Sequence, residues 1–236
     1  MNAAVDTARR EIAVPSLWGL ATIRQRIVRL PAQAQSTAAV ARQVEFRLGR
    51  SIAATLLREQ RSACELVGVG ADRAPQWPTG FIGTISHSPV LLGVATARRE
   101  AFNRELGCPD GPSGIGMDME PVIEGAALDD VRRYCLDDQE RQACRSLGSA
   151  REAWAVTAIF SAKEALFKCL YPIVRTFFDF RAVCIEPARL DDGRLDGRLK
   201  TTLSAAFPAG IVISGRCHFI QQHVVTAFHW PTGFQT

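Results

Sequence analysis

The chain has 236 residues, of which 47% are hydrophobic and 22% charged, so it can form one large globular domain or two small ones. Its formal net charge of +4 is a small excess for a nucleic-acid-binding protein; it suits an anionic cofactor or an acidic protein partner, although ordinary surface charge explains it equally well. No apolar run approaches the roughly 20 residues of a membrane span. The seven cysteines are scattered without a Cys-x-x-Cys pair, which argues against a zinc ribbon or a disulfide framework.

Two features of the sequence favour a cytoplasmic protein. The segment from Met1 to Arg10 lacks the apolar core of a secretory signal. An odd number of dispersed cysteines is most simply interpreted as a set of reduced thiols.

The first half of the chain predicts one long helix and a pair of strands. Ser36 is a candidate N-cap, and an apolar residue recurs every fourth position from Val40 to Leu56, which predicts a helix ending near Gln60. A loop rich in Gly and Pro, 68–80, holds Arg73. Strands are predicted at 81–88 and 90–97, around a tight turn, 86–89, that contains His87.

The second half predicts a further mixture of elements. A polar segment, 98–113, is expected to be a loop, and a short strand follows from Gly114. Helices are predicted at 129–147, broken near Leu136, and at 152–170, ended by Pro172. Strands are predicted at 182–186, 211–220 and 223–230. The order of these elements has no regular βαβ rhythm, which favours the α+β class.

Acidic and basic side chains combine in two of these elements. Asp118 and Glu120 would point to one side of their strand, because residues i and i+2 share a face. The later helix carries Lys163, Glu164 and Lys168. Three carboxylates and two ammonium groups can hold a divalent cation against a pyrophosphate. A solvated strand end and an ordinary surface salt bridge between Glu164 and Lys168 are the alternatives.

Several cations in the first half could bind phosphate. Arg42 and Arg50 lie on one stripe of the long helix, roughly opposite its apolar stripe, and Arg73 follows in the loop. His87 is flanked by Ser86, which adds a hydroxyl donor. A structural histidine and solvated arginines are the simpler interpretations of these residues when each is taken alone.

Taken together, these motifs resemble the 4′-phosphopantetheinyl transferases of the single-chain enterobactin and surfactin type. The matching segments occur in the family's order and are residues 42–50, 73–78, 83–88, 114–120, 160–168 and 177–180. Arg73 stands where the family usually has lysine, and a phosphate contact can survive that change with altered geometry. Met119 replaces the commoner Ile, Val or Ala and should face away from the metal.

The resemblance implies a fold and a division of labour. Two similar halves, each like an α/β sandwich, would be related by a pseudo-twofold axis, with the active site in the cleft between them. Residues 1–112 would bind the phosphates of coenzyme A, and residues 113–236 would bind the metal and catalyse the reaction. A monomer is expected.

The resemblance also implies an activity and residue roles. The enzyme would move phosphopantetheine from coenzyme A to a serine of an acidic acyl or peptidyl carrier protein, in fatty-acid, polyketide, siderophore or other nonribosomal-peptide biosynthesis. Mg²⁺, or Mn²⁺, would be held by Asp118, Glu120 and Glu164. Glu164 would be the base, directly or through a water, and Lys168 would stabilise charge on the pyrophosphate. The cofactor ligands would be Arg42, Arg50, Arg73, Ser86, His87, Asp118 and Lys168.

Two other functions remain compatible with the residues. A non-catalytic module that binds coenzyme A or docks on a carrier would keep the arginines without needing Glu164. A metal-dependent nuclease would also use clustered carboxylates, but it should carry a denser basic tract for the nucleic acid backbone.

Overall fold

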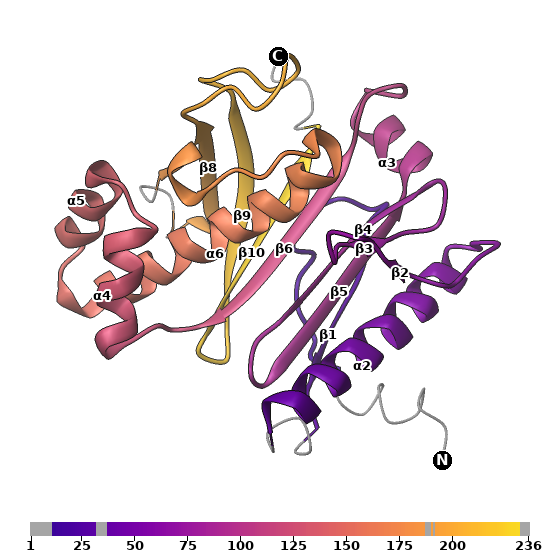
Figure 1. Cartoon of the computed structure of the whole chain (residues 1–236), viewed down its shortest axis with the longest axis horizontal. Coiled ribbons are helices and arrows are strands. Elements are labelled where there is room, and N and C mark those ends of the chain that lie inside the picture. Colours follow the sequence, from indigo (N-terminus) through magenta and orange to yellow (C-terminus); the bar gives the residue numbers. More distant parts are fainter. Residues whose placement is uncertain (1–10, 32–36, 187–189, 191, 232–236) are drawn as a thin grey trace. The chain divides into compact units, whose positions relative to one another are not determined.

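The computed structural model describes residues 11–31, 37–186, 190 and 192–231, which belong to two compact units, Met1–Ser113 and Gly114–Thr236 (Figure 1). Each unit combines helices with an antiparallel sheet, which confirms the α+β class. The pseudo-twofold relation between two halves stays a prediction. Across the described residues, we find no helix with the length and apolar character needed to cross a membrane.

Unit 1 is a three-stranded sheet with a long helix packed on it. The strands lie in the order β1 (Arg24–Arg29), β5 (Leu91–Arg98) and β4 (Phe81–His87), all antiparallel. Helix α2 (Ala38–Glu59) buries the later part of its apolar stripe against them, with Ile52 and Leu56 fully enclosed, whereas Val40 at the start of the stripe is exposed. This confirms the predicted helix. Its N-cap is Thr37, whose side chain accepts from the Val40 amide, whereas the predicted cap, Ser36, lies outside the described residues.

Three local expectations for unit 1 were wrong or incomplete. β4 extends to His87, so the turn begins at Ser88, whose hydroxyl accepts from the Leu91 amide at 3.0 Å. The predicted loop begins with helix α3 (Arg99–Glu105), because Phe102 is fully buried there and supplies an apolar anchor. The segment 68–80 contains a small hairpin, β2 (Gly68–Val69) and β3 (Pro75–Gln76).

Unit 2 is a five-stranded antiparallel sheet packed against helix α6 (Ser149–Val174). Its strands lie in the order β6 (Gly114–Pro121), β10 (His223–Trp230), β9 (Val212–Ile220), β8 (Arg194–Leu199) and β7 (Val183–Glu186). The strand β8 was not predicted. Helices α4 (Gly125–Tyr134) and α5 (Asp138–Ser146) and a short 3₁₀ helix, η2 (Phe180–Ala182), complete the unit.

The boundaries of the unit 2 helices have identifiable causes. Asp137 separates α4 from α5, as expected, because it forms a capping box with Glu140 at the start of α5. The predicted end of α6 at Pro172 was wrong. The helix continues to Val174 and closes at Arg175, which adopts a left-handed conformation (φ 54°) and donates its amide to the Tyr171 carbonyl at 2.9 Å.

The contact between β6 and α6 is unusually close because two glycines face the helix. A Cβ atom on Gly116 would lie 1.9 Å from the Ala165 carbonyl oxygen, and one on Gly114 would lie 2.1 Å from the Cys169 carbonyl oxygen. Alternation along the strand puts Asp118 and Glu120 on the same face as these glycines. The glycines therefore bring the two carboxylates against the helix that carries Glu164.

We predict that Gly116→Ala lowers the free energy of unfolding by on the order of 3 kcal/mol, because the new methyl group must push α6 away from β6. Urea denaturation monitored by circular dichroism measures this change. The control is Gly111→Ala, where a Cβ would make ordinary contacts of 3.5 Å or more with Cys108. Equal stability of the two variants would show that the strand and helix tolerate separation.

Candidate functional site

The acidic cluster of unit 2 forms where β6 faces α6. Asp118 is only 4% exposed, and its Oδ1 accepts from the Lys168 ammonium at 2.6 Å. Glu120 and Glu164 are half-buried beside this pair. The structure thus brings together the four predicted site residues of unit 2, one pair from the strand and one pair from the helix.

Crowding of these carboxylates perturbs their acidity. Burial, together with the charges of Asp118 and Glu164, raises the pKa of Glu120 to about 7, although Lys168 opposes the shift. Burial also raises the pKa of Glu164, with Lys168 opposing and Asp118 adding to the change. Burial is thus the main reason why these two neighbouring carboxyl groups resist ionisation.

The donor set fits a hard divalent cation in type and in charge. Carboxylate oxygens are the ligands that Mg²⁺ prefers, and three ionised carboxylates with one ammonium leave two negative charges uncompensated. The oxygen atoms of the three carboxylates do not converge on one point, however. Among the described residues, the three-residue group whose ligand atoms all lie within 4.8 Å of one another is Asp137, Glu140 and Cys184, elsewhere in the unit. Glu120 and Glu164 would therefore have to turn towards Asp118 to share an ion.

An aromatic pocket of about 240 Å³ lies next to Glu164. Its walls come from α6 and from the segment that follows it; the lining residues are Lys163, Glu164, Phe167, Phe177, Phe178, Asp179, Phe180 and Val183. Phe167 contacts both Phe177 and Phe178, with ring centroids 5.7 and 5.0 Å apart. The carboxylate of Glu164 thus borders a space that can take an apolar group.

Lys163 does not add its ammonium to the acidic cluster, contrary to the inventory taken from the sequence. It is 2% exposed, and its Nζ is bonded to Glu140 at 2.7 Å. Successive residues on a helix point about 100° apart, so Lys163 and Glu164 serve different surroundings.

In unit 1, Arg50 is half-buried, and its guanidinium is only partly satisfied by its neighbours. Its guanidinium lies over the Phe46 ring at 4.3 Å, and its Nη2 is 3.5 Å from the Gly68 carbonyl oxygen. Burial lowers the pKa of the guanidinium. The Nε atom is buried and has no hydrogen-bond partner among the described residues, a costly arrangement that an anionic oxygen would relieve. Arg42 is exposed on the same helix.

The other predicted ligands of unit 1 differ in exposure and in the direction of their side chains. His87 Nδ1 lies 3.5 Å from Glu45 Oε2, a partner that the sequence analysis missed although Glu45 lies between Arg42 and Arg50. Ser86 is buried and, by strand alternation, its hydroxyl points to the other face of β4. Arg73 is exposed in the β2–β3 hairpin with a positive φ of 65°.

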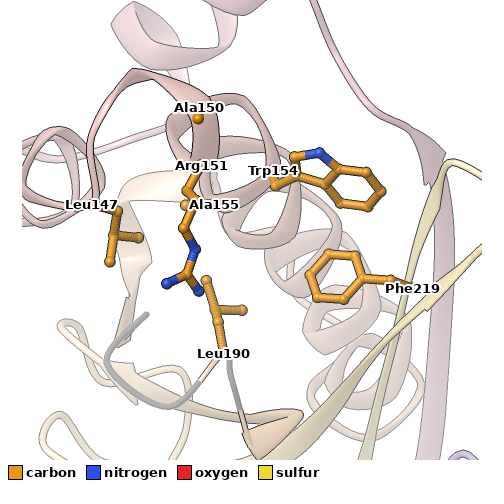
Figure 2. Close-up of a pocket in the computed structure, with 7 residues that line it drawn as sticks. All are labelled: Leu147, Ala150, Arg151, Trp154, Ala155, Leu190 and Phe219. Atoms are coloured by element: carbon orange, nitrogen blue, oxygen red, sulfur yellow. The ribbon is translucent and has the colours of Figure 1, made fainter.

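A second pocket of unit 2, about 340 Å³, is apolar (Figure 2). It is lined by Leu147, Ala150, Arg151, Trp154, Ala155, Leu190 and Phe219. Figure 2 shows Arg151 extending towards Leu190, while Trp154 and Phe219 meet in an edge-to-face contact with ring centroids 4.7 Å apart. These lining residues include no acid or base pair, so we assign no chemistry to this pocket.

Comparison with known proteins gives matches to two family models. Residues 114–226 match the 4′-phosphopantetheinyl transferase superfamily, and residues 30–97 match the 4′-phosphopantetheinyl transferase N-terminal domain. Together the two matches cover well over half of the chain. The first model spans the strand and helix that carry the acidic cluster, and the second spans Arg42 to His87.

Individual relatives agree with these family models. Enterobactin synthase component D of Salmonella typhi is 30% identical over 54% of this chain and 47% of its own length. The 4′-phosphopantetheinyl transferase Svp of Streptomyces mobaraensis is 31% identical over 55% and 48%. The 4′-phosphopantetheinyl transferase Npt of Nocardia iowensis is 27% identical over 66% and 63%. The chain thus spans about half the length of the first two of these curated relatives.

The raised pKa of Glu120 predicts a pH-dependent cost in the metal-free protein. A carboxyl whose folded pKa lies near 7 rather than 4.5 stabilises the fold below pH 4.5, and this stabilisation is lost as pH rises to about 7. Glu120→Gln should remove that loss. At pH 8 in a chelator, the variant should be more stable than the wild type by on the order of 1–2 kcal/mol, a value discounted for partial exposure.

Denaturant unfolding between pH 5 and pH 8 measures this difference. Adding Mg²⁺ at pH 8 should reduce the difference in stability between the variant and the wild type, because a bound cation favours ionised Glu120. The control is Glu186→Gln, which alters a half-exposed carboxylate on β7 that pairs with Arg198. Identical pH profiles for the wild type and Glu120→Gln would contradict the crowding of the carboxylates.

Proposed function

The chain belongs to the 4′-phosphopantetheinyl transferase superfamily, and we propose that it transfers phosphopantetheine from coenzyme A to a serine of an apo-carrier protein. The observation that carries this proposal is the cluster on β6 and α6, where Asp118, Glu120 and Glu164 meet Lys168. In the reaction, the serine oxygen forms a bond to the phosphorus that bears the pantetheine arm. The bond from that phosphorus to the leaving adenosine 3′,5′-bisphosphate breaks.

Three of these residues would hold the metal ion. Asp118 is fixed by the strand and by Lys168, and Glu120 and Glu164 would complete the oxygen set around Mg²⁺ or Mn²⁺. When bound, a divalent cation neutralises charge on the pyrophosphate and favours departure of the leaving group.

Glu164 is the proposed general base. Burial raises the pKa of its carboxyl, which moves it towards the range in which a carboxylate removes a proton effectively. Glu164 borders the aromatic pocket, so an acceptor serine of the carrier that entered this pocket would lie within its reach. Lys168 would donate to the pyrophosphate oxygens and stabilise the charge that develops on them.

The cations of unit 1 would bind the phosphates of coenzyme A. Arg50 is the strongest candidate because its buried Nε lacks an acceptor in the described residues. His87 would add a ring N–H donor to the anion in place of its contact with Glu45. Arg42 and Arg73 are exposed and can reach phosphate from solvent.

The proposed protein partner is an acidic carrier. Helices α4 and α5 form a depression of about 340 Å³ lined by Asp129 and by four arginines, Arg132, Arg133, Arg141 and Arg145. Arg132 and Arg141 also form ion pairs with Asp129 and Asp138, whose side chains are 74% and 98% exposed. Such a surface would increase the rate of encounter with an acidic carrier.

Transfer is tested by incubating the protein with coenzyme A, Mg²⁺ and apo-carrier proteins and weighing the carriers by mass spectrometry. We expect the carrier to gain one phosphopantetheine, and Glu164→Gln to slow turnover at least ~10²-fold, the lower range for loss of a general base. Melting temperature is measured on the same samples. If Glu164 and Lys168 formed only a surface salt bridge, Glu164→Gln would lower the free energy of unfolding by under ~1 kcal/mol and leave turnover intact.

Near-normal turnover in Glu164→Gln would overturn the catalytic role. If coenzyme A binds but no carrier in the panel is modified, the non-catalytic binding module becomes the better description.

We predict that Arg50→Ala raises KM for coenzyme A by roughly 10- to 150-fold, which corresponds to about 1.5–3 kcal/mol for a charge-assisted hydrogen bond. Arg47→Ala, an exposed neighbour on α2, is the matched control. The same measurement with 3′-dephospho-coenzyme A identifies the phosphate. If Arg50→Ala loses the same factor with both cofactors, Arg50 does not bind the 3′-phosphate. The same comparison of the two cofactors with His87→Ala tests whether His87 binds the 3′-phosphate.

A further inference from the structure

Lys163 is the centre of a buried polar hub in unit 2. Its Nζ donates to Glu140 Oε2 at 2.7 Å, to the Cys135 carbonyl at 2.8 Å and to the Phe180 carbonyl at 2.9 Å. An ammonium group has three hydrogens, so each of them has an acceptor. The side chains of Lys163 and Glu140 are 1% and 0% exposed.

Glu140 extends the hub to two more elements. Its Oε1 accepts from the Ile185 amide on β7 at 2.7 Å, and its Oε2 accepts from the Asp137 amide at 2.8 Å. One lysine and one glutamate therefore connect α6 with the end of α4, the start of α5, η2 and β7.

A metal is a poor candidate for this position, although Asp137, Glu140 and Cys184 have the spacing of a ligand set. Lys163 already occupies Glu140, and the Lys200 ammonium lies 2.8 Å from Asp137 Oδ2. Burial raises the pKa of the Cys184 thiol to about 11, so it is neutral at physiological pH. Two carboxylates and two ammonium groups balance without an ion.

The bond to Phe180 links the hub to the candidate active site. Phe180 is one of the residues that line the aromatic pocket beside Glu164, and its ring also packs on Phe160 of α6 with centroids 5.6 Å apart. Lys163 and Glu164 are consecutive, so the residue that carries the tether and the proposed base share one helical turn. A shift of Phe180 or a rotation of α6 would move the pocket wall relative to Glu164.

We propose that Lys163 is a positioning residue: with Glu140, it holds the segment 176–182 against α6 and so sets the pocket wall beside Glu164. This inference deepens the proposed function and rests on it for its effect on turnover. It differs from a role in binding phosphate, because the ammonium is enclosed and its three hydrogens are used within unit 2.

The variants are chosen to separate positioning from simple stability. Lys163→Met keeps the length of the side chain and removes the donor, but it leaves Glu140 buried without its counter-charge, which is strongly destabilising. The double variant Lys163→Met/Glu140→Gln removes both charges, so its melting temperature should recover most of the loss. Lys200→Met is the matched control, since it removes a lysine that pairs with Asp137 of the same hub but is 44% exposed.

Hydrogen exchange and steady-state kinetics provide two independent readouts. In the double variant, we expect the amides of residues 176–186 to exchange faster than in the wild type, because their tether is lost. We expect kcat to fall roughly 10- to 100-fold, the scale of a small misplacement of reacting groups, with KM for coenzyme A within about twofold. Lys200→Met should match the wild type in exchange of this segment and in kcat.

A folded double variant with wild-type exchange and wild-type kcat would overturn the inference. A raised KM for coenzyme A with unchanged kcat would also overturn it, in favour of a phosphate ligand. If the wild-type protein transfers nothing to any carrier, the proposed function fails. The exchange comparison alone then decides whether Lys163 holds the segment.

Discussion

The candidate site depends on one steric condition, the direct contact of a strand backbone with a helix backbone. Gly114 and Gly116 allow β6 to approach α6 so closely that any side chain at those positions would overlap the carbonyls of Cys169 and Ala165. Further along the same face of the strand, the contact continues with Asp118, which reaches Lys168. The strand and the helix thus act as two rigid supports, and the acidic residues occupy the place where their separation is fixed.

Electrostatics divides helix α6 into two sides. On one side, Lys163 is fully compensated by Glu140 and by main-chain carbonyls, and the surroundings are close to neutral. On the other, burial raises the pKa values of Glu164 and Glu120, and the charge of Asp118 adds to both shifts. A protein that concentrates uncompensated carboxylates gives up stability there. The pair of Lys163 and Glu140, on the other side of α6, can offset part of that lost stability by holding the helix in place.

The sequence allowed each half of the acidic cluster to be predicted because each half depends on a short-range rule, whereas the meeting of the two halves, fifty residues apart at Asp118 and Lys168, was implied by the family resemblance. Strand alternation predicted that Asp118 and Glu120 would share a face, and the spacing of Glu164 and Lys168 predicted one side of a helix. The partners of Lys163 and His87 could not be predicted in this way. Glu140 lies 23 residues from Lys163, and Glu45 belongs to another element than His87, so each pairing depends on tertiary packing. Strand β1 was missed because its residues, from Arg24 to Arg29, are mostly polar, and α3 because one buried Phe102 outweighs a polar surrounding sequence.

The order of strands in the unit 2 sheet has a consequence for synthesis of the protein. β6 opens the unit, yet its neighbour is β10, the last of the described strands in chain order, with Asp118 opposite Thr226. Thr226 in turn meets Ser161 of α6 through hydroxyl groups 2.8 Å apart. Pairings between such distant segments form slowly, because a long loop must close first. The nascent chain therefore carries Asp118 and Glu120 without their partner strand until β10 has been synthesised, and the candidate site cannot assemble before then.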